Sequence, residues 1–325
     1  MGPCPGHAKT FVMGSNRGRK AVASVIALWV TPFHLGHGSN GDLRRKIQSN
    51  REIGYRLVST RLDTRPSHGV RSSTYPIAVP TLFVVTTMPA IPDLSMRTLE
   101  AEIMDHPDLD ETQHTAALRG LERINRASGV AQTIWRPIFE LARSQPATPL
   151  RLLDIATGAG DLPIALRVRA NRHGLELEAN GCDKSPHATR YANRRAAQAG
   201  VAASFFELNV LAQPIPDGFD VIVASLFFHH LRFDQMTEVL EDMARAARRM
   251  VIVCDLRRCR SGLVAAHIGT RLLSRCGVVH TDGPRSVRAA CSVGEFESLV
   301  QRSGLKHAIV KRCWPMRMMI VWRRS

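Results

Sequence analysis

The chain has 325 residues, 44% of them hydrophobic, and a formal net charge of +16 at pH 7. This length suits one large domain or two ordinary ones, and the apolar share is enough for a buried core. With only three Tyr and four Trp, the composition argues against an aromatic-lined nucleic-acid platform.

The positive charge is concentrated at the two ends of the chain. Residues 1–87 hold 12 Lys or Arg against 3 Asp or Glu, residues 88–244 hold 15 against 21, and residues 245–325 hold 17 against 4. A basic C-terminal third fits nucleic acid, an anionic membrane surface or an acidic substrate. A solvated Arg-rich face explains the same count equally well.

Seven cysteines are present, and no two are spaced as Cys-x-x-Cys. The sequence therefore gives no support for a structural zinc site, and we expect no metal. Cys182 and Cys254 fall within apolar strand patterns, where free cysteine packs as a small hydrophobic side chain. This indicates a reducing compartment, the cytoplasm. No apolar run approaches the roughly 18 residues that a membrane span needs, although peripheral membrane contact stays open.

Residues 1–87 mix Gly, Pro, Ser and Arg with little periodicity, and we expect a basic extension of low order. Three origins stay open: a disordered extension, a weak targeting signal, or upstream sequence translated from a start codon that is not the natural one. The apolar run at 21–30 follows basic residues as in a secretory signal, but it starts late and lacks a clear A-x-A cleavage site. Met88 and Met96 stand just before the orderly pattern, which favours the first or third origin.

Apolar residues at helical spacing predict amphipathic helices over 95–106, 110–128 and 130–145, the last closing at Pro146. Residues 88–149 are therefore expected to form a helical cap ahead of a domain at 150–325. From residue 150 onward, short apolar strands alternate with helices. Strands are predicted at 150–157, 175–183, 203–210, 219–228, 249–255, 306–312 and 316–324, the last two joined by a tight Trp-Pro turn.

Cap signals support the helices between these strands. Ser185 and Pro186 supply an N-cap and a first helical residue, Asp234 opens another helix, and Ser292 begins a capping box whose helix stops at Gly304. The alternation predicts an α/β fold with a doubly wound, Rossmann-like, seven-stranded sheet.

The first strand runs into the glycine-rich stretch 152–163, LLDIATGAGDLP. In a doubly wound sheet, ligands bind at the carboxyl ends of the strands, near the point where strand order reverses. Gly158 and Gly160 allow close backbone approach and positive φ angles. Asp183 ends the second strand, 23 residues after Gly160, where a carboxylate accepts hydrogen bonds from both ribose hydroxyls of an adenosine.

The charge around this turn selects among nucleotide-like ligands. Pro163 occupies the third position of a dinucleotide G-x-G-x-x-G fingerprint, which disfavours a nicotinamide-dependent dehydrogenase. Asp154 and Asp161 place carboxylates beside the turn. They suit a cationic ligand better than an anionic one, and a sulfonium cofactor with an amino group is such a ligand.

Together with Asn209 and the stretch 219–231, FDVIVASLFFHHL, these residues resemble class I S-adenosylmethionine-dependent methyltransferases. The similarity is to the small-molecule branch that includes the ubiquinone and menaquinone ring methyltransferases. It covers roughly 150–325, and a helical cap ahead of the sheet also occurs in this branch. The resemblance implies S-adenosylmethionine as cofactor and methyltransferase activity. The cofactor-binding residues that it implies are Asp154, Ala156, Thr157, Gly158, Gly160, Asp161, Asp183, Lys184, Asn209, Val210, Ser225 and Leu226.

Within that set, the resemblance implies that the turn from Asp154 to Gly160 binds the methionine part of the cofactor and that Asp183 binds the ribose. Asn209 and Val210 would meet the adenine, while Ser225 and Leu226 would line the methyl-donor pocket. Two positions depart from the family pattern. Asp or Glu often stands where this chain has Asn209, and Gly-Cys or Gly-Thr often stands in place of Ala156-Thr157.

Chemistry on the acceptor side would come from later strand ends. His229 and His230 follow the fourth strand, where one of them, His230 preferred, could deprotonate a phenol or enol. Alternatively, His229 packs in the core and His230 caps the turn. The apolar stripe at 263–273 is either core or the wall of a greasy substrate site. The candidate acceptor-binding residues are Arg257, Arg258, His280 and Arg285. The alternative is that they are ordinary surface charges.

The leading hypothesis is methyl transfer to an O or C atom of a small aromatic, polyketide or quinone-like acceptor. An RNA methyltransferase is a second, motivated by the basic C-terminal third. However, the fourth strand ends in Ser-Leu-Phe-Phe-His instead of the Pro-Pro-aromatic motif of amino-methylating enzymes. A non-catalytic cofactor-binding protein on the same fold is a third hypothesis. The sequence leaves the acceptor and the oligomeric state open.

Overall fold

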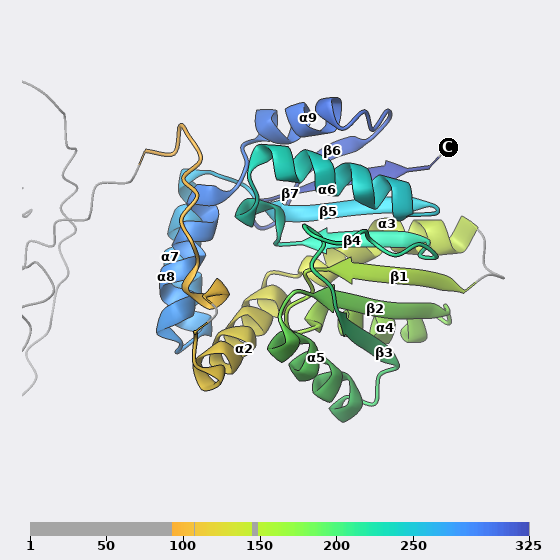
Figure 1. Cartoon of the computed structure of the whole chain (residues 1–325), viewed down its shortest axis with the longest axis horizontal. Coiled ribbons are helices and arrows are strands. Elements are labelled where there is room, and N and C mark those ends of the chain that lie inside the picture. The colour runs from red at the N-terminus through yellow and green to blue at the C-terminus, as the bar shows by residue number, and fades with distance from the viewer. Residues whose placement is uncertain (1–92, 107, 145–148, 325) are drawn as a thin grey trace, which may run out of the picture. The chain divides into compact units, whose positions relative to one another are not determined.

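The structure is a computed structural model that describes residues 93–106, 108–144 and 149–324. The basic extension expected over 1–87 lies outside the described residues. The described part is a seven-stranded sheet with helices against its faces and with further helices across one end (Figure 1). This confirms the predicted doubly wound, Rossmann-like α/β fold with helices ahead of the sheet.

The strand order is β3-β2-β1-β4-β5-β7-β6. β1 to β5 run parallel, whereas β7 is antiparallel to both β5 and β6. The order reverses between β1 and β4, so the switch point lies at the end of β1, where the glycine-rich stretch begins. The strands are β1 (Leu150–Ile155), β2 (Leu177–Asp183), β3 (Ala203–Glu207), β4 (Val221–Ser225), β5 (Met250–Leu256), β6 (Ile309–Cys313) and β7 (Arg317–Arg323).

Helices pack on both faces of the sheet and across its carboxyl edge. They are η1 (Ile103–Asp105), α2 (Glu111–Ala127), α3 (Val130–Ser144), α4 (Asp161–Arg172), α5 (Pro186–Gln198), η2 (Phe228–His230), α6 (Phe233–Ala246), α7 (Arg260–Leu273), α8 (Gly277–Ala289) and α9 (Val293–Arg302). None of the helices in the described part is both long and apolar enough to cross a membrane.

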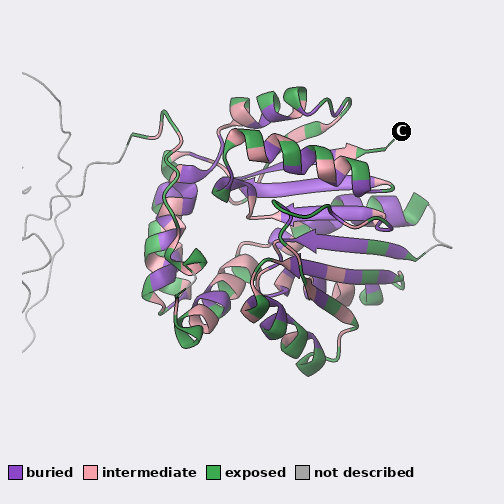
Figure 2. Cartoon of the chain, in the orientation of Figure 1, coloured by how far each residue is buried: buried purple, intermediate pink, exposed green. Residues whose placement is uncertain are grey.

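Alternating side chains of the central strands build two cores, one on each face. In β1, Leu150 and Leu152 pack with α3 and α4, whereas Leu153 and Ile155 pack with α6 and α9. Figure 2 shows the inner strands buried along most of their length. Strands covered on both faces are expected to be apolar throughout, and this explains why 219–225 is an almost unbroken apolar run.

Three helices lie across the ends toward which the arrowheads of β1 and β4 point, on the left of Figure 1: α2, α7 and α8. The segment 93–106 runs over the same end and contacts α8. The carboxyl ends of the parallel strands, where a doubly wound sheet binds its ligands, are therefore covered by elements from both ends of the described chain.

One prediction about this covering layer is wrong. The residues at 95–106 do not form a helix of that length; only η1 is helical, and the other residues have no regular secondary structure. The apolar side chains Met96 and Leu99 are exposed, and polar groups of the segment bind α8 and the loop after β4, so helical spacing was misleading. Helix α8, for which no element was predicted, forms with Gly283 and Pro284 in its sequence.

Candidate active site

The turn between β1 and α4 has a backbone that few sequences tolerate. Ala156, Gly158 and Gly160 have φ angles of 52°, 54° and 70°, so every second residue is left-handed. Glycine adopts this conformation readily, but alanine does so at a cost. Leu226, at the end of the neighbouring β4, is also left-handed, at φ 57°. Strained non-glycine residues cluster at functional sites, and these two lie at adjacent strand ends.

Carboxylates fix the shape of this turn. Asp183, at the end of β2, accepts the Gly158 N–H at 2.8 Å and the Ser185 N–H at 2.9 Å. Asp154, at the end of β1, accepts the Thr157 hydroxyl at 2.7 Å through Oδ2. Its other oxygen, Oδ1, is buried and has no hydrogen-bond partner among the described atoms. Together Asp154, Thr157, Gly158, Asp183 and the left-handed turn form what we call the cradle.

Burial raises the pKa of Asp154 well above its ordinary value, although the Thr157 hydroxyl opposes this. Burial also raises the pKa of Asp161 and of Asp183 against the hydrogen bonds that they accept. A buried carboxylate with a raised pKa gains most from a nearby cation. The unpartnered Asp154 oxygen and the acidic surroundings of the turn therefore fit a ligand with an ammonium or sulfonium charge.

Helix α2 covers the cradle. Leu118 is 1% exposed and packs with Ala159 and Tyr191, and it is the nearest neighbour, at 3.8 Å, of a Cβ built on Gly158. Asn125 Nδ2 donates to Asp161 at 3.2 Å. These contacts show why the second predicted helix belongs to the site.

The remaining residues predicted to bind the cofactor lie along the same edge. Lys184 follows β2 and pairs with Asp105 at 3.3 Å. Asn209 uses its side-chain oxygen to accept the Leu211 N–H, and Val210 is 8% exposed. Ser225 ends β4. Their roles toward a cofactor stay predictions.

Next to the cradle, the ends of β4 and β5 carry a buried histidine–carboxylate pair. His229 Nδ1 lies 2.7 Å from Asp255 Oδ1, and the His229 N–H donates to Asp255 Oδ2 at 3.0 Å. Although burial alone would raise the pKa of the Asp255 carboxyl, the His229 imidazole and the backbone N–H donors hold it below its ordinary value. On its far side, His229 Nε2 lies 3.7 Å from Glu102 Oε1.

His230 repeats this arrangement. Its Nδ1 lies 3.2 Å from Asp105 Oδ2, and its Nε2 lies 4.0 Å from Glu102 Oε2. Burial alone would lower the pKa of His230, but the hydrogen bond to Asp105 and the charge of Glu102 raise it to about 9. Both predicted histidines thus sit among carboxylates, and we call Glu102, Asp105, His229, His230 and Asp255 the histidine cluster.

The segment 93–106 delivers Glu102 and Asp105 to this cluster and is held by many polar contacts. Asp282 of α8 accepts the Ile103 and Met104 N–H groups, both at 3.0 Å. Ser286 donates to Glu102 at 2.5 Å. Arg97 donates to the carbonyls of Leu231 and Ala289, which ties the segment to the loop after β4.

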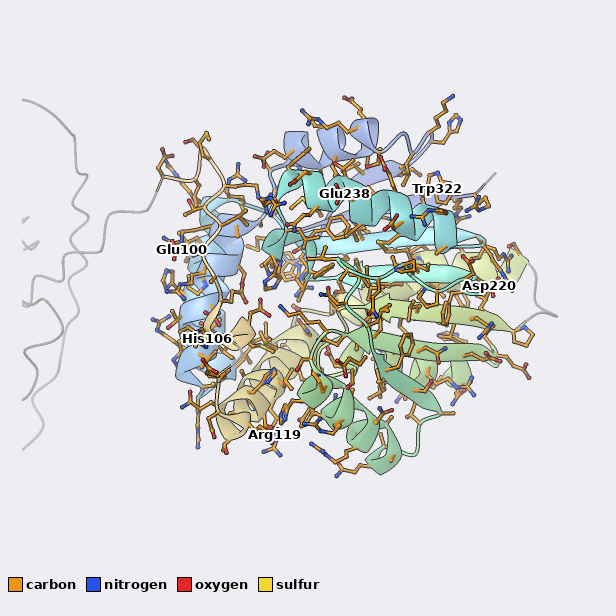
Figure 3. The ribbon with its side chains drawn as sticks, viewed as in Figure 1. Glu100, His106, Arg119, Asp220, Glu238 and Trp322 are labelled. Atoms are coloured by element: carbon orange, nitrogen blue, oxygen red, sulfur yellow. The ribbon has the colours of Figure 1, made fainter. Side chains whose placement is uncertain are left out.

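Three of the four predicted acceptor-binding residues serve this covering layer. Arg258 is 3% exposed at its side chain, forms a two-pronged pair with Glu295 at 2.8 and 3.0 Å, and donates to the carbonyl of Leu94. Arg285 pairs with Glu100, which Figure 3 labels on the segment 93–106. His280 contacts the Ser274 carbonyl. The structure accordingly gives them architectural contacts instead of a free guanidinium or imidazole.

Arg257 differs from these three, because its Nε is buried without a partner in the described part. Arg257 therefore stays a candidate for binding the acceptor.

Sequence reasoning missed Glu102 and Asp105. They lie more than 120 residues before His229 and His230, in a stretch predicted to be helical, and no local pattern linked them to the fourth strand.

Comparison with known proteins supports a methyltransferase domain. Residues 152–249 match the family described as "Methyltransferase domain". A demethylmenaquinone methyltransferase of Thermus thermophilus is 40% identical over 83 residues, which cover 25% of this chain and 36% of that protein. A second one, of Deinococcus radiodurans, is 33% identical over 99 residues, covering 30% and 39%. The chain thus spans little more than a third of the length of the curated relatives that it matches.

Among solved structures, the magnesium protoporphyrin IX methyltransferase of Synechocystis PCC 6803, determined with bound SAH, superposes with a TM-score of 0.42 at 16% identity. The superposition covers 61% of this chain and 84% of that one.

Proposed function

We propose that this chain, which carries a class I S-adenosylmethionine-dependent methyltransferase domain and is distantly related to the demethylmenaquinone methyltransferases, methylates a small molecule. The acceptor atom is an O or C atom of an aromatic, polyketide or quinone-like compound, and S-adenosylmethionine is the methyl donor.

One observation carries this proposal: the cradle lies at the switch point of the sheet and is acidic, with a buried Asp154 oxygen that lacks a partner among the residues that the structure describes. A dinucleotide pyrophosphate would meet carboxylates there. The ammonium group and the sulfonium of S-adenosylmethionine are complementary to them. The fit therefore favours this donor over a nicotinamide cofactor.

When bound, S-adenosylmethionine would supply a methyl carbon that a nucleophile of the acceptor can attack, with S-adenosylhomocysteine as the leaving group. The chain's own residues would hold it in place. Asp183 accepts hydrogen bonds from ribose hydroxyls with the lone pairs that Gly158 and Ser185 leave free. The left-handed turn lets the backbone approach the methionine part closely. Orientation of donor and acceptor supplies much of the rate in such a displacement.

The acceptor side is the histidine cluster, because it lies at the ends of β4 and β5, next to Ser225 and Leu226. His229 lies where a hydroxyl or enol of the acceptor would need a proton-accepting group. His230, whose pKa is raised to about 9, is protonated near neutral pH and would orient the acceptor by donating a hydrogen bond. The donor and acceptor halves of the site are joined by the pair of Lys184 with Asp105.

The RNA methyltransferase alternative draws little from this arrangement. It was motivated by the arginines of the C-terminal third, and several of those bind protein groups: Arg258 pairs with Glu295, Arg285 and Arg288 pair with Glu100, and Arg324 donates to the Ala247 carbonyl. Arginines that are engaged in this way contribute little to phosphate binding.

Turnover tests the proposal directly. The full chain is incubated with S-adenosylmethionine and a panel of phenols, polyketide fragments and reduced quinones, and mass spectrometry follows S-adenosylhomocysteine and methylated product. We expect turnover that falls at least about 100-fold in Asp183→Asn, because charged hydrogen bonds to the donor are lost. The matched control is Asp220→Asn. Asp220 also accepts a backbone N–H, that of Arg151 at 2.9 Å, but Figure 3 labels it at the opposite end of the sheet.

Donor binding without turnover on any acceptor would instead support the non-catalytic hypothesis. Methylation of RNA that weakens steeply with salt would support the RNA enzyme.

A further inference from the structure

The strongest unassigned feature is the way in which the histidine cluster converges. Glu102, His229 and His230 each offer one ligand atom, and these atoms all lie within 4.8 Å of one another. We propose that these three side chains bind a divalent transition-metal ion of the zinc class, although the sequence led us to expect no metal.

The geometry of the three ligand atoms suits one ion. The Nε2 atoms of His229 and His230 lie 3.7 and 4.0 Å from the two Glu102 oxygens. Two atoms that each sit about 2.1 Å from one ion are at most about 4.2 Å apart. Both separations fall inside this limit, whereas the 4.8 Å bound on the whole set exceeds it, so the side chains must rotate to bring all three ligand atoms onto one ion.

The second nitrogen of each imidazole is already held by a carboxylate. His229 Nδ1 contacts Asp255 at 2.7 Å, and His230 Nδ1 contacts Asp105 at 3.2 Å. Histidines that bind metal ions almost always donate their other ring N–H to a carboxylate, a carbonyl or water, which orients the ring and makes the free nitrogen more basic. The cluster has this arrangement twice, and Glu102 itself accepts the Ser286 hydroxyl.

Charge points the same way. Three carboxylates face the two imidazoles, and Lys184 pairs with one of them, Asp105. Arg97 approaches as well, but its guanidinium is directed at backbone carbonyls, including that of His229. Such an excess of negative charge in a partly buried place is offset either by protons on the imidazoles or by a bound cation.

The ligand types select the class of ion. Two imidazoles and one carboxylate suit Zn²⁺, Fe²⁺ or Co²⁺, whereas Mg²⁺ and Ca²⁺ prefer oxygen ligands throughout. Three protein ligands leave at least one coordination position open, as in catalytic zinc sites. His230 is 28% exposed and Glu102 is 12% exposed at the side chain, so the site is reachable from solvent.

An ion here would supply Lewis acidity to a hydroxyl of the acceptor. Only this role rests on the proposed function. The metal site stands on the geometry of the cluster alone.

Metal titration of the full chain tests the site without cofactor or acceptor. The purified protein is stripped with EDTA, dialysed, and titrated with Co²⁺, whose visible absorption reports its ligands, and then with Zn²⁺ in competition. We expect one equivalent to bind, with the spectrum of nitrogen and oxygen ligands. Glu102→Gln and His230→Gln should each weaken binding at least about 100-fold, and Asp105→Asn about 10- to 100-fold.

The matched control is His187→Gln. His187 also lies beside a carboxylate, Glu111 at 3.3 Å, but it lies outside the cluster, and its loss should leave the affinity within about twofold. Circular dichroism confirms that each variant is folded. If Glu102→Gln does not fold, His230→Gln decides the question, because that ring is partly exposed.

Three results would overturn the site. The first is the absence of stoichiometric binding, and the second is equal affinity in wild type and His230→Gln. The third is a Co²⁺ spectrum with thiolate charge-transfer bands, which would assign the ion to one of the free cysteines. Because neither readout uses S-adenosylmethionine, failure here leaves the proposed function untouched.

Discussion

The cradle and the histidine cluster lie side by side on one sheet edge, but they are held in different ways. The cradle is a single turn in which Asp154 accepts the Thr157 hydroxyl, and Asp183, at the end of the adjacent strand β2, accepts the Gly158 and Ser185 N–H groups. The histidine cluster joins β4, β5 and the segment 93–106, and it depends on α8 to hold that segment. One site is made locally and the other by long-range packing.

This difference has a consequence for stability. A turn held by carboxylates at the neighbouring ends of β1 and β2 should keep its shape when contacts with the segment 93–106 are lost. The histidine cluster takes Glu102 and Asp105 from the segment 93–106, so it should lose its geometry when the contacts that hold this segment are broken. Mutations that break the contacts holding the segment 93–106 should therefore disturb the histidine cluster and spare the cradle.

The largest expected effect is that of Arg258→Met. The substitution removes a two-pronged pair and leaves Glu295 and the carbonyls of Leu94 and Ala290 without their donor. We expect a loss of about 3 kcal/mol in the free energy of unfolding, measured by urea denaturation. The exposed Arg275, changed to Met, is the control and should cost less than about 0.5 kcal/mol. Equal losses in the two variants would show that the contacts of Arg258 contribute nothing to the free energy of unfolding.

A smaller effect is expected in the cradle, and two glycines separate its causes. Gly160 and Gly174 have φ angles of 70° and 65°. A Cβ at Gly160 would lie 2.6 Å from the Phe205 ring, whereas nothing lies within 4 Å of one at Gly174. Gly174→Ala should cost about 1 kcal/mol for the left-handed backbone alone, and Gly160→Ala about 2–3 kcal/mol because of the added clash. Equal melting temperatures for the two variants would contradict this assignment.

The smallest effect on stability, and the one most specific to the donor side, is that of Asp154→Asn. Burial raises the pKa of this carboxyl in the folded chain, so the folded chain holds the proton more tightly than the unfolded chain does. The stabilisation is full below the ordinary carboxyl pKa and is lost as the pH rises through the folded pKa. The asparagine variant lacks this titration, while its amide oxygen can still accept the Thr157 hydroxyl.

We therefore expect the stability of Asp154→Asn relative to wild type to increase between pH 5 and pH 8, as measured by denaturation without ligand, while its affinity for S-adenosylmethionine falls. A stability difference that does not change with pH would show that the carboxyl is not perturbed in the folded chain.

The fold was largely predictable because its signals are local. The strands that became β1 and β5 were predicted from apolar runs, and Ser185 and Ser292 cap α5 and α9 as their sequences indicated. Some strand ends were placed too far along: β3 stops at Glu207 and β4 at Ser225. Beyond Ser225 the apolar residues Leu226 and Phe228 belong to a turn and η2, since apolar character persists where the chain turns while staying buried.

Within the site, too, only the local part could be predicted. The residues of the cradle were found from the sequence, because Gly158 and Gly160 directly follow one predicted strand and Asp183 ends the next. Glu102 was not, because its partner Ser286 is 184 residues away and a contact of that kind leaves no periodic trace. The pairing of Arg258 with Glu295 left no trace in the sequence either, because only the folded chain brings the two side chains together; the role of Arg258 toward an acceptor stays a prediction.

Calorimetric titration of the full chain with S-adenosylmethionine, and separately with NADH, distinguishes a sulfonium site from a dinucleotide site. We expect micromolar binding of S-adenosylmethionine and none of NADH. We further expect that Asp183→Asn weakens binding at least about 10-fold, while Asp220→Asn binds as wild type does. A well-folded chain that fails to bind S-adenosylmethionine, or that binds it equally well in Asp183→Asn, would contradict the assignment of the cradle as a methyl-donor site.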